Sequence, residues 1–600
     1  MSILSLISNH MNQNQPTMKR SPLYLFILAS LVISLASCKS DSSSTSNATA
    51  QDGTLHIRKK RDAQKLHPFV YPSPAARDVY QYIFTQLADF DPESLELIPV
   101  LIKEVPQEIK ITEGPHAGSI KFTMEYLPEA KWDDGTDITA RDYVFSVKTA
   151  KNLKVKAAGY RSHLQFISDV IIDPDNPKKF DVIFSKDYLL AKETACTIET
   201  YPAHIYDPNG VTKDLSFADA GDEDKLNAII EKDSTLMQWA DDMNGLKYGR
   251  EVVNGCGPYK LTEWKTDEYI ILDRKENYWG AGSDNPFLQA GPKRIIFDIL
   301  PDETTAMTQL KEGNLDLVTE VSGAAFTNVQ KEENDFQYLT PQLMKYYMIA
   351  MNNDRPELSD KKVRTALGHL LDVDGVIQSI DYGNGTRTVG PIHPGKNYYN
   401  KGLGLLDYNP EKAKKMLADA GWKDTNGDGT IDKNISGNST ELELDMYVSE
   451  GKLGQQIALL MQEATSTAGI KMNIIQKPYK QIEADHLKKK DFDMTPMMVR
   501  QDLVLDDPYT RWHSDHTKAG GRNIYGFENE EIDKITKEIQ LSDDPAVRNK
   551  LYNRVQEILY EEQPVIFLYA PSERIIGSSK WNMKPTVRRP GYLANTFTLK

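Results

Sequence analysis

Positive charge is in short supply in this chain. Its 71 lysine and arginine residues are outnumbered by 86 aspartate and glutamate residues, which gives a formal net charge of -15 at pH 7. Proteins that bind a phosphate backbone need a basic face to contact it. We therefore expect no nucleic-acid partner.

Common catalytic signatures are also missing. The sequence has no G-x-S-x-G nucleophile motif, no H-E-x-x-H metal motif and no glycine-rich loop of the kind that holds phosphates. Scattered acidic residues in an acidic chain are mostly solvated surface. We therefore expect a protein that is not an enzyme and that carries no cofactor.

Long apolar runs are absent, apart from the segment PLYLFILASLVISLA that starts at Pro22. This segment is shorter than the roughly 20 residues that a membrane-spanning helix needs. It follows Lys19 and Arg20 and ends at Leu35-Ala36-Ser37-Cys38, a pattern typical of a lipoprotein signal. No later segment is long enough to span a bilayer, so the rest of the chain should be soluble outside the membrane.

The signal defines the expected N-terminal processing. Residues 1–37 would be removed, with Met18 as an alternative start of translation, and Cys38 would carry the lipid. The Ser/Thr/Asn-rich stretch 38–52 resembles a flexible tether. The chain should then lie on the extracytoplasmic side of a membrane of the cell envelope, as a lipid-anchored monomer.

Only 3 cysteines are present in the whole chain. With Cys38 assigned to the lipid, Cys196 and Cys256 remain as the single pair that could form a disulfide in an oxidising compartment. Two buried free thiols are the alternative, because the sequence does not give the Cα separation that a disulfide requires.

Hydrophobic periodicity predicts mixed α/β structure. The length of 600 residues is enough for two to four domains or one large composite fold. Residues 120–126 alternate like a half-buried strand, and Thr139 and Asp142 have the spacing of a capping box before a helix. A helix is predicted from Pro410 to Gly421. Residues 442–474 read as strand, helix and strand, which indicates a mainly parallel sheet. A long helix containing Val547 to Leu559 leads into the strand PVIFLYA.

Four strings resemble one protein family, in order and spacing. They are WDDGTDITARDYVFSVK (132–148), NGCGPYKLTEW (254–264), the segment 346–377 and YNPEKAKKMLADAGWKDTNGDGTID (408–432). A matching start and end flank them. Together they resemble the family 5 extracellular solute-binding proteins of peptide-type ABC transporters, the dipeptide- and oligopeptide-binding group.

The resemblance implies a bilobed, three-domain α/β fold of the type II periplasmic-binding-protein class, with a hinge between the lobes. The base domain of lobe 1 would comprise 53–92, 200–345 and 565–600, with a second domain, 93–199, inserted into it. Lobe 2 would comprise 346–564. The implied function is capture of a peptide between the lobes and its delivery to a membrane permease.

The resemblance also suggests ligand-binding residues. Asp502 aligns where relatives hold the peptide ammonium, with Asp506 as a rival, because about two residues are extra before Pro508. Oligopeptide binders carry an arginine shortly upstream of this acid, and this chain has Pro496 at that position. Arg500, which lies nearby, is a possible substitute for that arginine.

On the facing lobe, Tyr160 in AGYRSHLQF (158–166) maps to a tyrosine of the cleft. Asp62 and Ala63 match a stretch that pairs with the ligand main chain. Relatives show a small hydroxyl residue in place of Cys256, a difference that favours a disulfide with Cys196. Ordinary packing is the alternative for each of these residues.

We expect no metal site. The loop 424–432 matches the first part of a calcium loop, but Ile435 stands where the closing acid belongs. His513, Asp515 and His516 are expected to form a surface cluster, and Met494, Met497 and Met498 to line a core or a pocket.

Two kinds of alternative to peptide import remain, a different solute and a different role. The same fold could bind an oligosaccharide, a nickel chelate or haem. The chain could also act as a surface receptor or sensor that does not transport its ligand.

Overall fold

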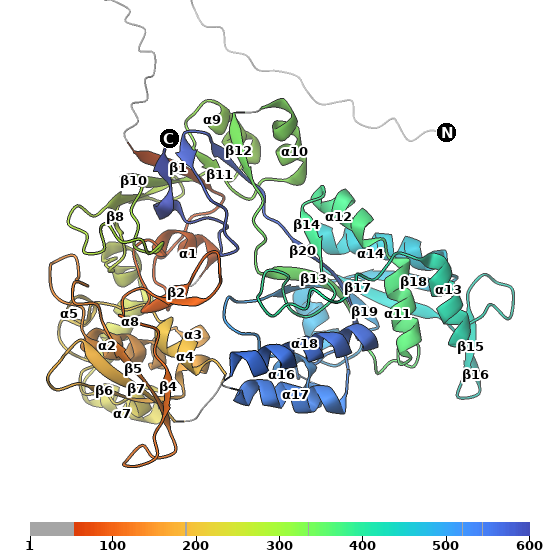
Figure 1. Ribbon diagram of the computed structural model, residues 1–600, viewed down its shortest axis with the longest axis horizontal. Helices are drawn as coiled ribbons and strands as arrows, with labels where there is room; N and C mark the ends of the chain where they lie inside the picture. The colour runs from red at the N-terminus through yellow and green to blue at the C-terminus, as the bar shows by residue number, and fades with distance from the viewer. Residues whose placement is uncertain (1–52, 72, 186–188, 334, 519, 543) are drawn as a thin grey trace, which may run out of the picture. The chain divides into compact units, whose positions relative to one another are not determined.

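The computed structural model describes residues 53–600, except 72, 186–188, 334, 519 and 543 (Figure 1). The predicted signal peptide, tether and lipidated Cys38 lie outside the described residues. Within the described part, no helix has the length and apolar character needed to cross a membrane.

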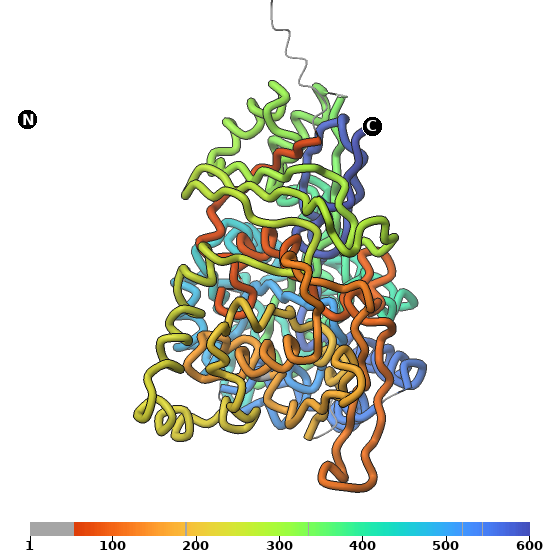
Figure 2. The backbone as a smooth tube through the Cα atoms, turned by 90° about the vertical axis from the view of Figure 1, so that its left-hand side faces the viewer, coloured from red at the N-terminus to blue at the C-terminus, as the bar shows by residue number. Residues whose placement is uncertain are grey.

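A seven-stranded mixed sheet is built from three distant stretches of the chain. Its order is β12 (Phe336–Leu339), β21 (Ile575–Ser578), β11 (Leu317–Val318), β1 (Thr54–Lys59), β10 (Arg294–Ile299), β9 (Tyr269–Arg274) and β8 (Tyr259–Lys265). Strand β1 pairs in parallel with β10 and β11, and the other neighbours are antiparallel. Figure 2 shows the red first strand in the same region as the blue C-terminal strands.

A four-stranded antiparallel sheet follows the order β4 (Glu108–Lys110), β5 (Ile120–Glu125), β7 (Lys179–Phe184) and β6 (Ile167–Ile172). The predicted alternation at 120–126 is confirmed, because Ile120, Phe122 and Met124 are buried on one face of β5. The predicted capping box is confirmed too: the Thr139 N–H donates to Asp142 Oδ2 at 2.9 Å, at the start of α2 (Ala140–Lys151). One hydrophobic core contains residues of both sheets, and we call this part of the molecule lobe 1.

A six-stranded sheet forms the centre of the part that we call lobe 2. Its order is β14 (Gly385–Arg387), β20 (Val565–Pro571), β13 (Lys345–Met351), β19 (Met494–Arg500), β17 (Glu443–Val448) and β18 (Lys471–Gln476). The predicted strand-helix-strand unit is confirmed as β17, α14 (Lys452–Ser466) and β18, with the two strands parallel.

The expectation of a mainly parallel sheet in lobe 2 is wrong. Strand β13 pairs antiparallel with β19 and β20, and β14 pairs antiparallel with β20. The reason is that these strands come from separate stretches of the chain rather than from a succession of helical crossovers, and only crossovers impose parallel pairing.

Helices cover both faces of the six-stranded sheet. One core packs α11, α12, α13 and α14 against it, and a second core on the other face contains residues of α17 and α18. The predicted helix at 410 is confirmed as α13 (Pro410–Asp419), in which Asn409 caps the Lys412 N–H at 3.0 Å. The remaining helices of lobe 2 are α11 (Lys361–Leu370), α12 (Val373–Asp381), α15 (Tyr479–Gln481), α16 (Tyr509–Trp512), α17 (Glu530–Leu541) and α18 (Pro545–Glu562).

Lobe 1 carries shorter helices. They are α1 (Pro74–Tyr80), α3 (Ala158–Leu164), α4 (Ala191–Cys196), α5 (Ala203–Tyr206), α6 (Phe217–Ala220), α7 (Glu223–Lys232), α8 (Thr235–Asn244), α9 (Glu303–Lys311) and α10 (Gly323–Glu332). Small two-stranded pairs complete the molecule: β2 (Ala88–Phe90) with β3 (Leu97–Pro99), β15 (Asp432–Ile435) with β16 (Asn438–Glu441), and β22 (Trp581–Asn582) with β23 (Thr598–Leu599).

Two connecting segments, 340–344 and 572–574, join the sheets of the two lobes. They lie side by side, since Gln342 and Ser572 form an antiparallel bridge and the Glu573 N–H donates to the Pro341 carbonyl at 2.8 Å. The resemblance implies that the chain returns to lobe 1 at residue 565. The strand that begins there, β20, instead belongs to the six-stranded sheet of lobe 2. The passage back to lobe 1 therefore begins after Pro571.

Candidate functional site

The loop after β19 places Asp506 in a buried ion pair. Lys396 Nζ lies 2.9 Å from Asp506 Oδ2, with 3% and 17% of the two side chains exposed. The Tyr398 hydroxyl and Gln501 Nε2 donate to the same carboxylate at 3.0 and 2.8 Å. Because its oxygens are used within the protein, Asp506 is poorly suited to bind a ligand ammonium.

Asp502, four residues earlier in the same loop, has a different environment. Its side chain is exposed, and no hydrogen bond or ion pair joins its carboxylate to another described residue. Gln501 ties this loop to the segment around residue 393: its Nε2 donates to the Pro391 carbonyl at 3.0 Å, and its Oε1 accepts from the His393 N–H at 2.6 Å. The loop is thus anchored while the Asp502 carboxylate stays accessible.

Arg500 is the last residue of β19 and is exposed. Its register partner is Lys345, whose Nζ forms an ion pair with Glu573 Oε1 at 2.8 Å. Arg500 and Asp502 therefore supply charges of both signs next to one of the connecting segments.

Tyr160 belongs to a buried polar group in lobe 1. Its hydroxyl donates to Glu199 Oε2 at 3.0 Å, and Gln86 Nε2 donates to Glu199 Oε1 at 3.1 Å. The Tyr160 ring packs edge-on against Phe69, with centroids 4.9 Å apart. Burial raises the pKa of Glu199 and places that of Tyr160 well above its ordinary range.

Arg77 of α1 is a charged neighbour of this group that the sequence did not single out. Burial alone would lower the pKa of its guanidinium. The interactions of the guanidinium with Tyr80, Tyr160 and Glu199 outweigh the effect of burial, so the pKa is raised. Part of the side chain remains exposed. No local motif marks Arg77 or Glu199, because only the fold brings residues 77, 160 and 199 together.

Asp62 is engaged within lobe 1. Its Oδ2 accepts from the Asp267 N–H at 2.8 Å and from Trp264 Nε1 at 3.2 Å, and its Oδ1 accepts from the Gln64 N–H at 2.9 Å. Ala63 is buried, with 1% of its surface exposed. These contacts fix the turn after β1 against the β8–β9 hairpin, so any contribution of this stretch to a ligand would come from its backbone.

The disulfide expected between Cys196 and Cys256 is not formed. Both residues are fully buried free thiols. Cys196 Sγ contacts Met124 Sδ at 4.0 Å, whereas the pKa of Cys256, raised chiefly by burial, is also affected by Lys275 and Thr85. The two side chains therefore pack among different neighbours in the same core.

The loop 424–432 uses its own oxygens. Asp424 accepts from the Gly427 and Gly429 N–H groups at 2.6 and 3.0 Å, and Asp432 accepts from the Thr425 N–H at 2.8 Å. His513, expected at the surface, is buried. Within the described residues, no group of three or more histidine, cysteine or acidic side chains could hold a metal ion.

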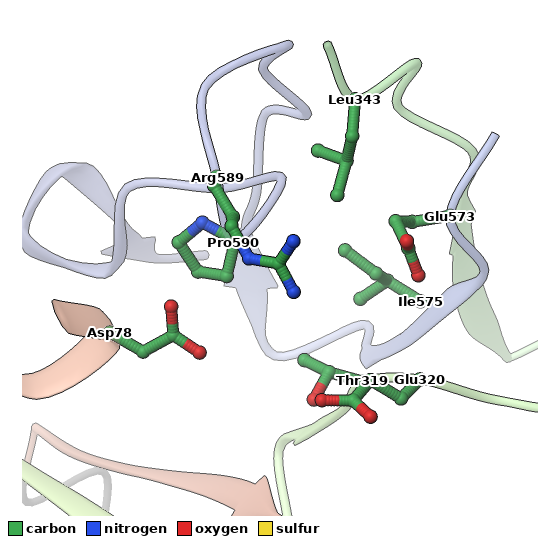
Figure 3. Close-up of a pocket in the computed structure, with 8 residues that line it drawn as sticks. All are labelled: Asp78, Thr319, Glu320, Leu343, Glu573, Ile575, Arg589 and Pro590. Atoms are coloured by element: carbon green, nitrogen blue, oxygen red, sulfur yellow. The ribbon is translucent and has the colours of Figure 1, made fainter. Parts of the chain in front are cut away.

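A cavity of about 20 Å³ lies where the connecting segments meet lobe 1 (Figure 3). Its lining comprises Asp78, Thr319, Glu320, Leu343, Glu573, Ile575, Arg589 and Pro590. This volume has room for about one water molecule. A peptide or a sugar would not fit, so the cavity is not the site of a solute.

Comparison with known proteins agrees with the fold. The family model "Bacterial extracellular solute-binding proteins, family 5 Middle" matches residues 121–521. Oligopeptide-binding protein AppA of Bacillus subtilis is 25% identical over 569 residues, which covers 93% of this chain and 94% of AppA. Heme-binding protein A of Haemophilus influenzae is 26% identical over 347 residues, covering 57% of this chain and 58% of that protein.

A solved structure shows the same fold. The structure of Bacillus subtilis AppA in complex with a nonapeptide superimposes with a TM-score of 0.61 at 22% identity, over 91% of this chain and 99% of AppA. The family model covers well over half of the 600 residues. This chain belongs to the family 5 bacterial extracellular solute-binding proteins.

Proposed function

We propose that this chain is the substrate-binding lipoprotein of an ABC importer, which captures peptides between its lobes and delivers them to a membrane permease. The observation that carries the proposal is the exposed carboxylate of Asp502. The other candidate acid of the same loop, Asp506, already forms an ion pair with Lys396. Support comes from a relative named as an oligopeptide-binding protein that matches nearly the whole chain.

The proposed chemistry of recognition follows from this arrangement. A free peptide N-terminus is a cation, and a carboxylate is its natural partner in a charge-assisted hydrogen bond. The ligand main chain would be recognised as an added strand, while side chains occupy roomy pockets. Tyr160 would contribute its ring, because its hydroxyl already donates to Glu199. No catalytic step is proposed.

Binding would shift an equilibrium between open and closed arrangements of the lobes, since contacts with both lobes form only on closure. The permease would recognise the closed form. In this proposal Cys38 carries the lipid that keeps the monomeric binder at the extracytoplasmic membrane surface.

Haem or another small solute is the second candidate. A relative named as a heme-binding protein matches more than half of the chain at similar identity. Native mass spectrometry of protein purified from its host separates the candidates, because a co-purified peptide ladder and a single haem mass differ plainly. Neighbouring permease and ATPase genes would favour import over a role as a sensor.

The direct test of the ammonium role is Asp502→Asn. We expect it to weaken binding of a pentapeptide with a free N-terminus about 10- to 100-fold, because a hydrogen bond to a charged group is lost. Binding of the N-acetylated peptide should change little. Asp419→Asn, at an exposed aspartate at the end of α13, is the matched control. Equal affinity of the wild type for the free and acetylated peptides would exclude this role for Asp502.

A further inference from the structure

The guanidinium of Arg77, in α1, has hydrogen-bonding capacity that the protein does not use fully. No ion pair joins it to an acidic side chain of another described residue. Glu199, the acid that influences its pKa, has its two oxygens engaged by Gln86 and by the Tyr160 hydroxyl. Because the chain has 86 acidic residues against 71 basic ones, an arginine without a paired carboxylate is unexpected. Its five N–H donors are available for an anion from outside the protein.

The surroundings of Arg77 favour such an anion. The residue is exposed, yet burial is the largest influence on the pKa of its guanidinium. The guanidinium is therefore partly dehydrated although solvent can reach it. Attraction between opposite charges is stronger in such an environment than in bulk water.

The Tyr80 hydroxyl, beside Arg77, is a second unused group. Tyr80 is 2% exposed, and its hydroxyl has no hydrogen-bond partner among the described residues. Arg77 influences the pKa of Tyr80, so the two groups are neighbours, although their geometry is not that of a hydrogen bond. A buried hydroxyl is normally paired. A ligand oxygen that accepts from both groups would complete the pairing.

Arg77 lies near the passage between the lobes. Asp78, which follows it in α1, lines the small cavity together with Leu343 of segment 340–344 (Figure 3). Tyr160, whose ring the proposed function places against the ligand, is another neighbour of Arg77. The guanidinium is thus close both to a connecting segment and to the proposed site.

Asp502 approaches the same connecting segment from lobe 2. The N–H of the preceding residue, Gln501, donates to the Met344 carbonyl at 2.9 Å. Leu343 and Met344 are adjacent in the chain. Arg77 and Asp502 therefore lie near one short stretch, one in each lobe. Their charges are opposite, as are the charges of the two ends of a free peptide.

We propose that Arg77 and Tyr80 bind the carboxylate end of the peptide, so that the site selects short peptides with a free C-terminus. A guanidinium binds a carboxylate through two parallel hydrogen bonds, and the Tyr80 hydroxyl donates a third. Asp502 holds the ammonium from the other lobe. Because both charges lie near the same short stretch, only a peptide of a few residues reaches both. This role of Arg77 rests on the proposed function.

The test compares trialanine with trialanine amide, which lacks the terminal carboxylate, by isothermal titration calorimetry on the full chain with Cys38→Ser. We expect the wild type to bind the acid about 10-fold or more tightly than the amide, because a hydrogen bond to a charged group is made only with the acid. Arg77→Gln should weaken binding of the acid about 10- to 100-fold and change that of the amide little. Arg77→Lys keeps the charge without the paired geometry and should recover only part of the loss.

Tyr80→Phe separates a binding role from a structural one. It should weaken binding of the acid about 3- to 10-fold. Thermal stability should stay the same or rise, because burying a hydroxyl without a partner costs free energy. Lower stability with unchanged binding of the acid would overturn the role of this hydroxyl. Arg141→Gln, at an exposed arginine of α2, is the matched control and should change neither property.

The failures of this role and of the proposed function are distinguishable. If the wild type binds the acid and the amide equally well, the proposed function stands and the carboxylate site is excluded. Loss of discrimination in Arg500→Gln but not in Arg77→Gln would assign the carboxylate to Arg500 and overturn the role of Arg77. If the wild type binds neither probe, the role of Arg77 fails, and the pentapeptide of the Asp502 test decides the proposed function separately.

Discussion

Lys396 and Asp506 form an ion pair that connects the loop after β19 to the segment around residue 396. Nζ and Oδ2 are 2.9 Å apart, and both side chains are largely buried. The pair occupies the Asp506 carboxylate and holds in place the loop that also carries Asp502.

Replacing Asp506 should therefore affect stability first. Asp506→Asn leaves Lys396 buried without its counterion, so we expect a loss of about 3 kcal/mol in the free energy of unfolding, measured by urea denaturation. Lys396→Met should cost a similar amount, and the double variant should cost less than the sum of the two. An Asp506→Asn protein of wild-type stability with abolished peptide binding would instead make Asp506 the ligand acid.

His67 should make the protein sensitive to mild acid. Burial lowers its pKa to about 3, whereas an unfolded histidine has a pKa of about 6.5. Between these two pKa values the unfolded chain binds a proton at His67 and the folded protein does not. The free energy of unfolding is therefore highest above pH 6.5 and decreases as the pH falls. At pH 5 the loss from this residue should be about 2 kcal/mol.

The variant His67→Gln should flatten that pH dependence in urea unfolding at pH 7 and pH 5. A wild-type stability that does not fall between pH 7 and pH 5 would contradict the assignment.

Glu199 should give a pH dependence of the opposite sign. Because burial raises its pKa, the folded state holds the carboxyl proton more tightly than the unfolded state does. The contribution of Glu199 to the free energy of unfolding is then fully present below the pKa that a glutamate has in the unfolded chain, about 4.3. It is lost as the pH rises through the pKa that Glu199 has in the folded protein. We expect Glu199→Gln to become progressively more stable than the wild type from pH 4 to pH 8, measured by thermal unfolding. A difference independent of pH would count against this.

Gly255 should tolerate no side chain. A Cβ there would lie 2.3 Å from the Ile83 carbonyl oxygen, a backbone atom that cannot easily move. Gly255→Ala should cost about 1–3 kcal/mol in unfolding free energy, as overpacking does. Gly159→Ala, where no atom lies within 4 Å of the added Cβ, should cost nothing. Equal stability of the two variants would show that the turn at residue 83 can shift.

Local structure followed well from the sequence. The capping box at Thr139 and Asp142 and the helix at Pro410 depend on contacts within a few residues, and the strand-helix-strand unit at 442–474 pairs two strands that a single helix connects. Such contacts are encoded in spacing and side-chain type. Long-range pairing is not, and the antiparallel neighbours of β13 could not be inferred from any single segment.

The candidate site shows the same division. The sequence itself determined that the chain is acidic and poor in cysteine and that it carries the motifs of family 5, and it named Asp502 and Asp506, four positions apart, as candidate acids. Only the tertiary structure decided which of the two acids is exposed, because the partner of Asp506 lies 110 positions away. The same holds for the unpaired thiols and for Arg77 beside Tyr160, since burial and close approach depend on surfaces that meet only when the chain is folded.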